Sequence, residues 1–127
     1  MVGVDTIVNA YGAAWLAADE AERRRLLEIA WSENGVYQDP TADISGREAL
    51  VRHIAGFHHR MPGTTIVITS GVDHHHGKIH FLWKMVTPDG KTALEGRDFG
   101  EIDPDGRICR IAGFFGPPPP PAAGTDR

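Results

Sequence analysis

The sequence predicts an α+β fold in which three N-terminal helices pack on the concave face of a curved antiparallel sheet to form a cone. Two observations support this prediction. Apolar residues recur at helical spacing as far as residue 60, and after Gly63 the period changes to the alternation typical of strands. When helices and antiparallel strands occupy separate stretches of a chain, the helices collect on one face of the sheet. The mouth of such a cone is a natural pocket for a small molecule.

Length and charge limit the classes of function. The chain has 127 residues, within the range of roughly 100–200 residues for one domain. Its 13 Lys and Arg against 17 Asp and Glu give a net charge of −4, which argues against a nucleic-acid partner because such proteins cluster positive charge. No apolar run approaches the roughly 18 residues of a membrane span, and the N-terminus lacks the pattern of a signal peptide. We therefore expect a cytoplasmic protein with no membrane partner.

The first two helices are predicted from apolar spacing and capping residues. The first is expected to begin with Asp5 as its cap and to run to the stretch before Asp19. Asp19 is expected to cap the second helix, because it stands three residues before Glu22 in a variant of the capping box. This second helix is expected to include Trp31 and to end at Asn34-Gly35.

A short strand and the third helix follow. Residues 35–39 are expected to form a short extended segment that Pro40 closes. Ser45 and Glu48 have the spacing of a capping box in its standard form. A third helix is therefore expected to begin there and to end before Met61.

The rest of the folded chain is predicted to consist of strands. Four longer strands are expected over residues 64–71, 78–86, 92–102 and 107–115. The turn sequences Pro88-Asp89-Gly90 and Asp103–Gly106 join the last three, since Pro presets one dihedral angle and Gly adopts the positive one. Such short connections make these strands a sequential antiparallel meander.

A proline-rich tail is expected to follow a single domain. Five of the nine prolines lie in residues 117–121, so the segment 117–127 is expected to be polyproline II or disordered. The domain itself is expected to span residues 1–116.

Asp98 is the first candidate for chemistry. On the strand 92–102 it shares a face with apolar residues, and Gly96 and Gly100 lie two residues to either side. An unpaired carboxylate among apolar neighbours costs several kcal/mol, so Asp98 is expected to keep its proton or to meet a hydrogen-bond donor. The flanking glycines are expected to leave room for a ligand beside it. The alternative is a buried aspartate that hydrogen-bonds to a side chain of a neighbouring strand.

Several short motifs occur in a consistent order from about Tyr11 to Gly116. Among them are Tyr37-Gln38-Asp39-Pro40, Ser45-Gly46-Arg47, Gly96-Arg97-Asp98 and Gly113-Phe114-Phe115-Gly116. Their order and spacing resemble the SnoaL-like branch of the nuclear-transport-factor-2-like superfamily. The resemblance implies a cystatin-like cone and a homodimer. It implies little about the reaction, because this fold hosts isomerases, cyclases, dehydratases, epoxide hydrolases and binding modules.

Within that superfamily, the resemblance to ketosteroid isomerase suggests catalytic residues. Its general base lies in a Glu-Asp-Pro segment similar to Gln38-Asp39-Pro40, its neutral aspartic acid matches Asp98, and its tyrosine matches Tyr11. The resemblance thus implies that Asp39 removes a proton beside a carbonyl group while Tyr11 and protonated Asp98 bind the developing enolate. A slip in the register of the first helix would place Trp15 there instead. Simple turn chemistry is the alternative role of Asp39, since Asp-Pro commonly begins turns.

Histidines and aromatic residues supply the remaining candidates. No metal site is expected from His58-His59 or His74–His76, because adjacent histidines point in different directions and no Cys cluster or His-Glu-x-x-His motif supports them. His59 and His75 are candidates to face the pocket, and a place on the surface is the alternative for both. The residues expected to contact a ligand are Trp15, Phe57, Trp83, His59, His75 and Phe115.

Three functions stay open at the level of sequence. The first is a cofactor-free isomerase that moves a proton on a hydrophobic, steroid-like or polyketide-like carbonyl compound. The second is a module that binds such a small hydrophobic molecule without reaction. The third is a polyketide cyclase that uses Asp98 or His75 in an aldol-like closure. A homodimer is expected, because a second copy would cover apolar residues on the convex face of the open sheet.

Overall fold

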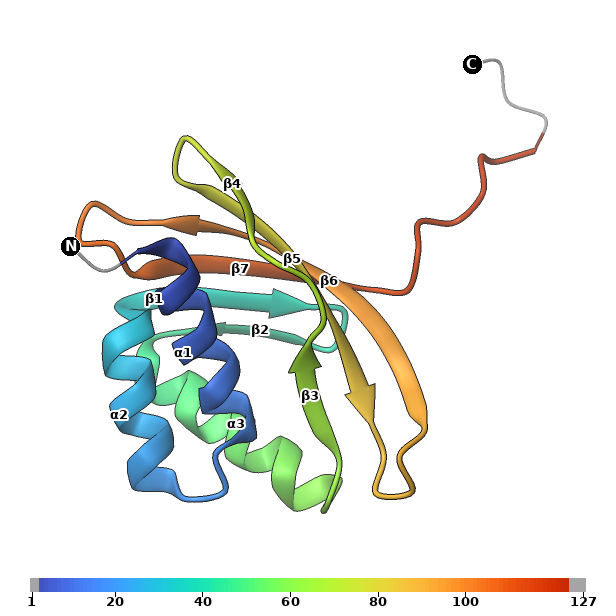
Figure 1. Ribbon diagram of the computed structural model, residues 1–127, viewed down its shortest axis with the longest axis horizontal. Coiled ribbons are helices and arrows are strands. Elements are labelled where there is room, and N and C mark those ends of the chain that lie inside the picture. The colour runs from blue at the N-terminus through green and yellow to red at the C-terminus, as the bar shows by residue number, and fades with distance from the viewer. Residues whose placement is uncertain (1–2, 124–127) are drawn as a thin grey trace.

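Three helices cover the concave face of a curved sheet, which confirms the predicted α+β cone (Figure 1). The computed structural model describes residues 3–123. The helices are α1 (Val4–Leu16), α2 (Glu20–Ala30) and α3 (Arg47–Arg60). Asp19 caps α2 as expected, because its side chain accepts a hydrogen bond from the backbone N–H of Glu22 at 3.1 Å.

Seven strands form one sheet. They are β1 (Trp31–Asp39), β2 (Ala42–Ser45), β3 (Thr65–Ile68), β4 (Asp73–His75), β5 (Lys78–Val86), β6 (Thr92–Ile102) and β7 (Ile108–Phe115). Their order is β2-β1-β7-β6-β5-β3, and β4 pairs with β5 as well. Strands β5, β6 and β7 form the predicted meander, and Gly90 and Gly106 adopt the positive φ that the turns between them require.

The expectation of a wholly antiparallel sheet is wrong at one place. Strand β1 pairs with β7 in parallel, whereas every other pair of strands is antiparallel within the described residues. Parallel neighbours need a long crossover connection, and here the chain passes through α3 and five further strands before β7 returns beside β1. The sheet is therefore mixed, and this parallel pair places the first strand beside the last.

Tertiary packing overrides two of the local signals. Helix α2 ends at Ala30, and Trp31 already belongs to β1. The predicted stop at Asn34-Gly35 lies inside that strand, where the register shifts. A Cβ atom at Gly35 would lie 2.4 Å from Nε1 of Trp31, so the glycine gives the buried indole its space rather than ending a helix.

The expected caps of α1 and α3 are also wrong. The cap of α1 is Gly3, and Asp5 lies in the first turn, where its negative charge favours the helix dipole. The predicted capping box at Ser45 is absent because Ser45 ends β2 and Gly46, with φ of 97°, takes the cap position without a side-chain hydrogen bond. Glu48 pairs instead with Arg24 of α2 at 2.8 Å.

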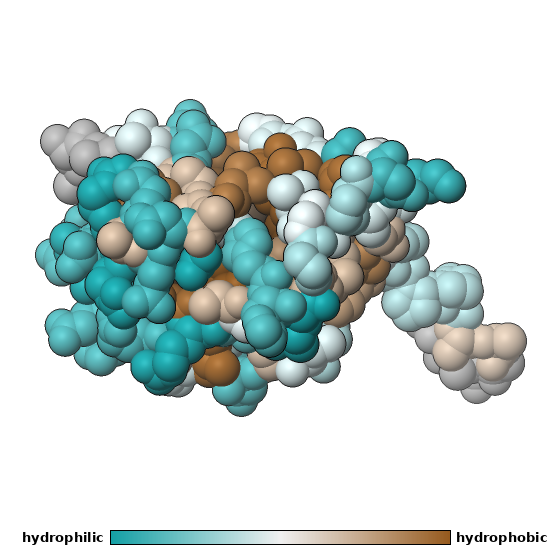
Figure 2. All heavy atoms as spheres, turned by 90° about the horizontal axis from the view of Figure 1, so that it is seen from below, coloured by the Kyte–Doolittle hydropathy of each residue, from teal (hydrophilic) through white to brown (hydrophobic). Residues whose placement is uncertain are grey.

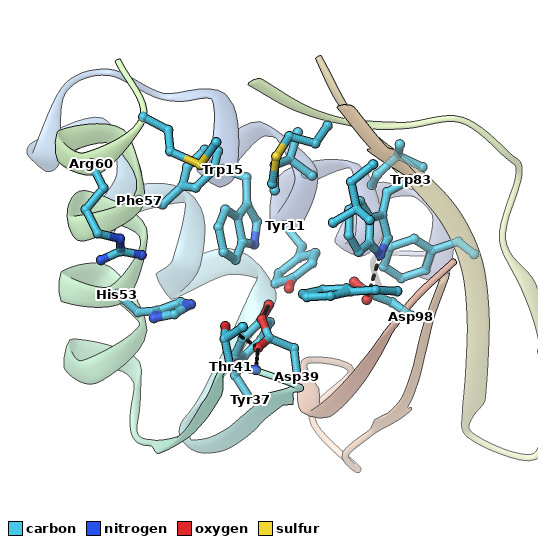
Figure 3. Close-up of a pocket in the computed structure, with 18 residues that line it drawn as sticks. Tyr11, Trp15, Tyr37, Asp39, Thr41, His53, Phe57, Arg60, Trp83 and Asp98 are labelled. Carbon is cyan, nitrogen blue, oxygen red and sulfur yellow. Dashed lines mark hydrogen bonds between the residues drawn. The ribbon is translucent and has the colours of Figure 1, made fainter. Parts of the chain in front are cut away.

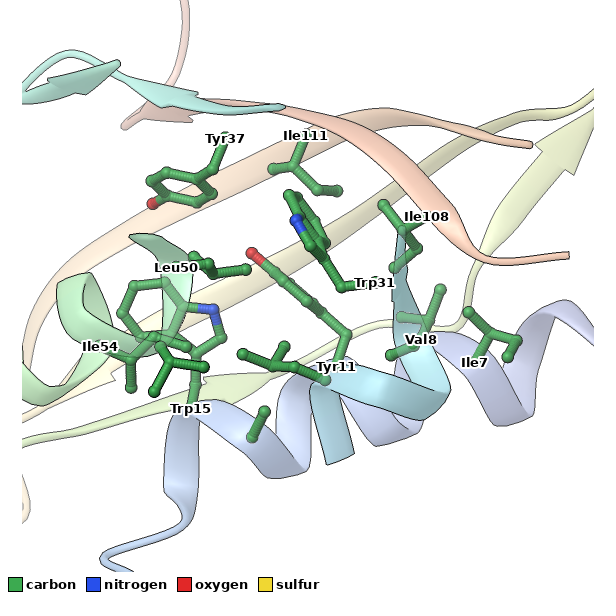
Figure 4. Packing of buried hydrophobic residues seen from close by; sticks show 14 of the residues in the cluster. Ile7, Val8, Tyr11, Trp15, Trp31, Tyr37, Leu50, Ile54, Ile108 and Ile111 are labelled. Atoms are coloured by element: carbon green, nitrogen blue, oxygen red, sulfur yellow. The ribbon is translucent and has the colours of Figure 1, made fainter. Parts of the chain in front are cut away.

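The core lies between the helices and the sheet and fixes the orientation of α1 (Figure 4). Tyr11 stacks on Trp31, with ring centroids 5.6 Å apart. Leu27, Leu50 and Ile108 are fully buried around them. Burying one such side chain contributes about 2 kcal/mol. This packing holds one face of α1, and hence Tyr11, toward the inside of the cone.

The outer face of the sheet exposes several large apolar side chains. Leu82, Phe99 and Phe114 are 43%, 43% and 46% exposed. The homodimer expected from such a face stays a prediction, which light scattering at micromolar protein concentration tests. Among the helices of residues 3–123, none has both the length and the apolar character needed to cross a bilayer.

The described part of the tail, residues 117–123, is exposed and projects away from the body (Figure 1). Figure 2 views the molecule from below and shows hydrophobic residues that reach the surface among hydrophilic ones, with the tail to one side. The end of the predicted tail, residues 124–127, lies outside the described residues, as do residues 1 and 2 of the expected domain.

Candidate active site

A cavity of about 320 Å³ lies between the helices and the inner face of the sheet (Figure 3). Helix α1 contributes Tyr11 and Trp15 to its wall, and β1 and β6 contribute Asp39 and Asp98. The three residues predicted to be catalytic, Tyr11, Asp39 and Asp98, therefore line the same space. The rest of the wall is mostly apolar, as is usual for a small-molecule site.

Asp98 lies on the inner face of β6, as the alternation of that strand predicts. Its side chain is 6% exposed, and the indole N–H of Trp83 on β5 donates to its Oδ1 at 3.0 Å. The pKa of Asp98 is raised to about 7, chiefly by burial. The hydrogen bond from Trp83 opposes this rise, and the negative charge of Asp39 adds to it. Asp98 therefore has the partner on a neighbouring strand, and its raised pKa favours the expected proton below about pH 7.

The hydrogen bond from Trp83 also distinguishes the two oxygens of Asp98. An indole N–H can only donate, so Oδ1 acts as an acceptor. The proton of neutral Asp98 then belongs on Oδ2, to which no other residue among 3–123 is hydrogen-bonded. Asp98 consequently has one O–H group available for a ligand in the cavity.

The glycines beside Asp98 do not leave room for a ligand, contrary to expectation. A Cβ atom at Gly96 would lie 2.1 Å from the indole of Trp83. One at Gly100 would lie 2.4 Å from the backbone oxygen of Arg110. The protein itself therefore fills both spaces. Gly96 instead allows Trp83 to lie flat against β6 and to reach Asp98.

A third glycine, Gly113, separates the two aspartates. Asp98 on β6 pairs with Gly113 on β7, and the register that pairs Gln38 with Ala112 places Asp39 on β1 beside the same glycine. A Cβ atom at Gly113 would lie 2.9 Å from Oδ1 of Asp98 and 3.4 Å from Cβ of Asp39. Because neighbouring strands are about 4.8 Å apart, the two aspartate Cα atoms are about 10 Å apart. The missing side chain lets both carboxyl groups border the cavity.

Asp39 has surroundings that differ from those of Asp98. Its Oδ2 accepts a hydrogen bond from the hydroxyl of Tyr37 at 2.6 Å. Its Oδ1 accepts two more from Thr41, from the backbone N–H at 2.7 Å and from Oγ1 at 2.8 Å. The bonds to Thr41 are the turn chemistry that Asp-Pro predicts. Asp39 therefore makes the turn and also lines the cavity, so its two predicted roles are compatible.

Tyr11 and Trp15 both face the cavity because they lie one helical turn apart on α1. The slip in the register of the first helix, which would have replaced Tyr11 by Trp15 at the site, therefore does not arise, because both residues line the cavity. Tyr11 is 3% exposed. Burial, and after it the negative charge of Asp98, raises the pKa of its hydroxyl group, which stays a donor throughout the physiological range.

Helix α3 supplies the expected Phe57 and, beside it, two residues that the sequence analysis did not expect in the site, His53 and Arg60. His53, Phe57 and Arg60 line the cavity from successive turns of this helix (Figure 3). His53 packs between the rings of Tyr37 and Trp15, at centroid distances of 5.2 and 5.8 Å. Burial lowers the pKa of His53, the charge of Asp39 raises it, and Arg60 lowers it further. His53 is therefore a neutral imidazole at pH 7.

Of the residues expected to contact a ligand, Trp15, Phe57, Trp83 and Phe115 line the cavity. His59 and His75 do not. His59 points to solvent from the last turn of α3, and His75 lies in the exposed β4 hairpin beside His76. Residues 3–123 contain no group of three or more His, Cys, Asp or Glu side chains placed to hold a metal ion.

Solved structures resemble this chain over most of its length. A protein of the SnoaL-like family from Agrobacterium tumefaciens, provisionally assigned as an isomerase, is 32% identical with a TM-score of 0.83, and the match covers 88% of this chain and 96% of that one. A provisionally assigned SnoaL-like polyketide cyclase from Jannaschia is 14% identical with a TM-score of 0.68, over 88% of this chain and 83% of the other.

A third structure is that of a protein of unknown function with a cystatin-like fold from Methylobium petroleophilum. It is 19% identical with a TM-score of 0.73, and the match covers 98% of this chain and 81% of that one. At such identities the last two structures show the fold alone. No curated protein sequence matches the chain. The model of the SnoaL-like domain matches residues 8–111. With this match and the relative at 32% identity, the chain belongs to the SnoaL-like family.

Proposed function

We propose that the protein is a cofactor-free isomerase that moves a proton on a small hydrophobic carbonyl compound. The observation that supports this most is the pair of aspartates beside Gly113, which border one apolar cavity in different environments. Proton transfer needs a charged base and a neutral donor at pH 7. Asp39 is suited to the first role and Asp98, with its raised pKa, to the second.

The proposed reaction converts a β,γ-unsaturated ketone to its conjugated isomer. Asp39 takes a proton from the carbon between the carbonyl group and the double bond, and the electron pair of that C–H bond delocalises onto the carbonyl oxygen. The hydroxyl groups of Tyr11 and protonated Asp98 donate hydrogen bonds to this oxygen and stabilise the dienolate. Asp39 then returns the proton to the far alkene carbon, so that no atom is gained or lost.

The hydrogen bonds of Asp39 fit the role of a base. Tyr37 and Thr41 hold its carboxylate in one orientation at the cavity wall, and a base in a defined orientation needs little rearrangement at the moment of transfer. The mostly apolar wall lowers the local dielectric constant, which strengthens each hydrogen bond made to the enolate oxygen.

Ultraviolet absorbance tests the proposal, since only the conjugated product absorbs strongly at long wavelength. Cyclohex-3-en-1-one and a 3-oxo-5-ene steroid form a panel of two sizes, which suits a cavity of about 320 Å³. We expect at least one of them to gain conjugated absorbance at a rate proportional to protein concentration. Saturable binding of both compounds with no change of absorbance would contradict the isomerase.

That contradicting result would favour the second candidate, a non-catalytic module that binds hydrophobic ligands. The observation on its side is that both aspartates already hold hydrogen bonds from the protein, from Tyr37, Thr41 and Trp83. A polyketide cyclase is the third candidate, and the structure from Jannaschia that is provisionally assigned as a cyclase shares its fold with this chain. A cyclase would use the same base and enolate stabilisation to form a carbon–carbon bond.

A further inference from the structure

Arg60 is a solvent-exposed cation that borders a mostly apolar cavity. It is the last residue of α3, lines the cavity, and its guanidinium packs against Gly56, where a Cβ atom would lie 2.9 Å from Nη1. Its side chain makes no hydrogen bond or ion pair with any other residue in 3–123. By contrast, Arg24 and Arg25 of α2 are both paired with glutamates. Five N–H donors of Arg60 are therefore free to bind a ligand.

The charges around the cavity are separated in space. Figure 3 shows Arg60 and His53 on one side, on α3, and Asp98 with Trp83 on the opposite side, on the sheet. His53 is neutral, since burial lowers its pKa. Arg60 is thus the permanent positive charge among the described residues that line the cavity. A ligand with an anionic group would be repelled by Asp39 and attracted to Arg60, so only one orientation in the cavity is favourable.

We infer that the substrate of this site is a hydrophobic carboxylate, a keto acid whose carboxylate pairs with Arg60 while its apolar body fills the cavity. The inference rests on the proposed function in that it names the substrate class for the same site. The planar guanidinium matches a carboxylate with two parallel hydrogen bonds. A favourable effect on the helix dipole would account for a positive charge in the last turn of α3. It does not require that this charge line the cavity, as Arg60 does.

A matched pair of probes tests the inference by binding alone. The probes are 4-cyclohexylbutyrate and its neutral isostere 4-cyclohexylbutanamide, neither of which absorbs where tryptophan does. Trp15 and Trp83 line the cavity, so their fluorescence reports occupancy. At low salt we expect the carboxylate to bind about tenfold more tightly than the amide, and the difference to shrink as NaCl screens the charge.

Variants of arginine localise the effect. Arg60→Met should abolish the preference for the carboxylate while the amide binds as before, and Arg60→Lys should restore part of it. Arg52→Met is the matched control, since Arg52, like Arg60, is exposed on α3 but does not line the cavity. The preference should therefore persist in this variant. Equal affinities of the two probes in the unmodified protein, or a preference that survives Arg60→Met, would overturn the inference.

These outcomes are separable from the fate of the proposed isomerase. A protein that prefers the carboxylate through Arg60 but leaves every β,γ-unsaturated ketone unchanged supports the inference and refutes the isomerase. A protein that isomerises neutral ketones and binds both probes equally refutes the inference and leaves the isomerase standing. Urea denaturation is the control for folding. If the midpoint of the Arg60→Met protein equals that of the unmodified protein, a lost preference for the carboxylate does not come from unfolding.

Discussion

Asp39 and Asp98 border the same cavity but have opposite surroundings. Asp98 is almost wholly buried in the middle of the sheet with one donor, Trp83. Asp39 lies at the end of β1 with three hydrogen bonds from Tyr37 and Thr41. Burial penalises the charged form of a carboxyl group, whereas donors stabilise it. Burial thus suits Asp98 to the role of a proton donor, and Asp39 is left for the role of the base. The difference comes from the strands on which they lie.

The largest effect is expected on turnover, when the carboxyl group of Asp39 is replaced by an amide. Asp39→Asn should lower turnover of the isomerised ketone by about a hundredfold or more, because a positioned general base contributes at least that factor. Ligand affinity should change little, since the amide fills the same space. Steady-state absorbance kinetics and equilibrium binding measure the two quantities.

Asp43→Asn is the control for this change. Asp43 lies on β2, is exposed and does not line the cavity, so its loss should leave turnover unchanged. If the Asp39→Asn protein retains normal turnover, Asp39 is only a turn residue and the contrast between the two aspartates has no catalytic meaning.

The second effect concerns stability and comes from the buried aspartate. The pKa of Asp98 is about 7 in the folded protein against an ordinary value of 3.8. Between these values the folded state binds one more proton than the unfolded state, so stability falls as pH rises from about 4 and the loss is complete above about 7. At about 1.4 kcal/mol per pH unit the loss amounts to about 4 kcal/mol.

Asp98→Asn should remove this loss, because the neutral amide keeps the acceptor for Trp83. The variant should therefore gain stability over the unmodified protein at pH 8 and much less at pH 4, as measured by urea denaturation at both values. The exposed Asp105→Asn serves as control and should show no such pH dependence. An equal stability difference at pH 4 and pH 8 would mean that Asp98 is ordinary in its titration.

A smaller effect is expected from the donor itself. Trp83→Phe removes the hydrogen bond that lowers the pKa of Asp98, so the midpoint of its titration should move upward. The pH dependence of stability measures this shift. Trp15→Phe removes another indole from the cavity wall without a hydrogen bond to Asp98 and should leave the midpoint in place. A downward shift in the Trp83→Phe protein would contradict the role given to that bond.

The smallest effect is expected at the two histidines outside the cavity. His59→Gln and His75→Gln should leave ligand affinity and turnover within experimental error, because both side chains are exposed and neither lines the cavity. Fluorescence titration with the cyclohexyl probes checks this. A tenfold loss of affinity in either variant would show that the ligand extends beyond the cavity.

The spacing of apolar residues predicted most of the fold, because it indicates which side chains of a helix or strand are buried. The change of period after Gly63 separated α3 from the strands that follow, and the alternation of residues 92–102 placed Asp98 on the inner face. Short strands such as β2 and β4 contain too few residues to show a period. The parallel pairing of β1 with β7 depends on contacts distant in sequence, and no local signal reports it.

The site was predictable where one element determined it. The spacing of His53, Phe57 and Arg60 by four and three residues was available in the sequence and would have placed all three on one face of a helix. The roles of Gly96 and Gly113 could not be predicted from the sequence, since each glycine accommodates a side chain from another strand. The same is true of Trp83, whose hydrogen bond to Asp98 crosses between β5 and β6.

Carbon-13 NMR of the labelled aspartate carboxyl groups tests the account most directly. The signal of Asp98, identified by its absence from the Asp98→Asn protein, should titrate with a midpoint near pH 7, as burial in the cavity wall requires. A midpoint near 3.8, the value of a free aspartate, would show that this carboxyl group is charged at neutral pH. Asp98 would then be unable to donate a hydrogen bond to an enolate, and the proposed mechanism would fail.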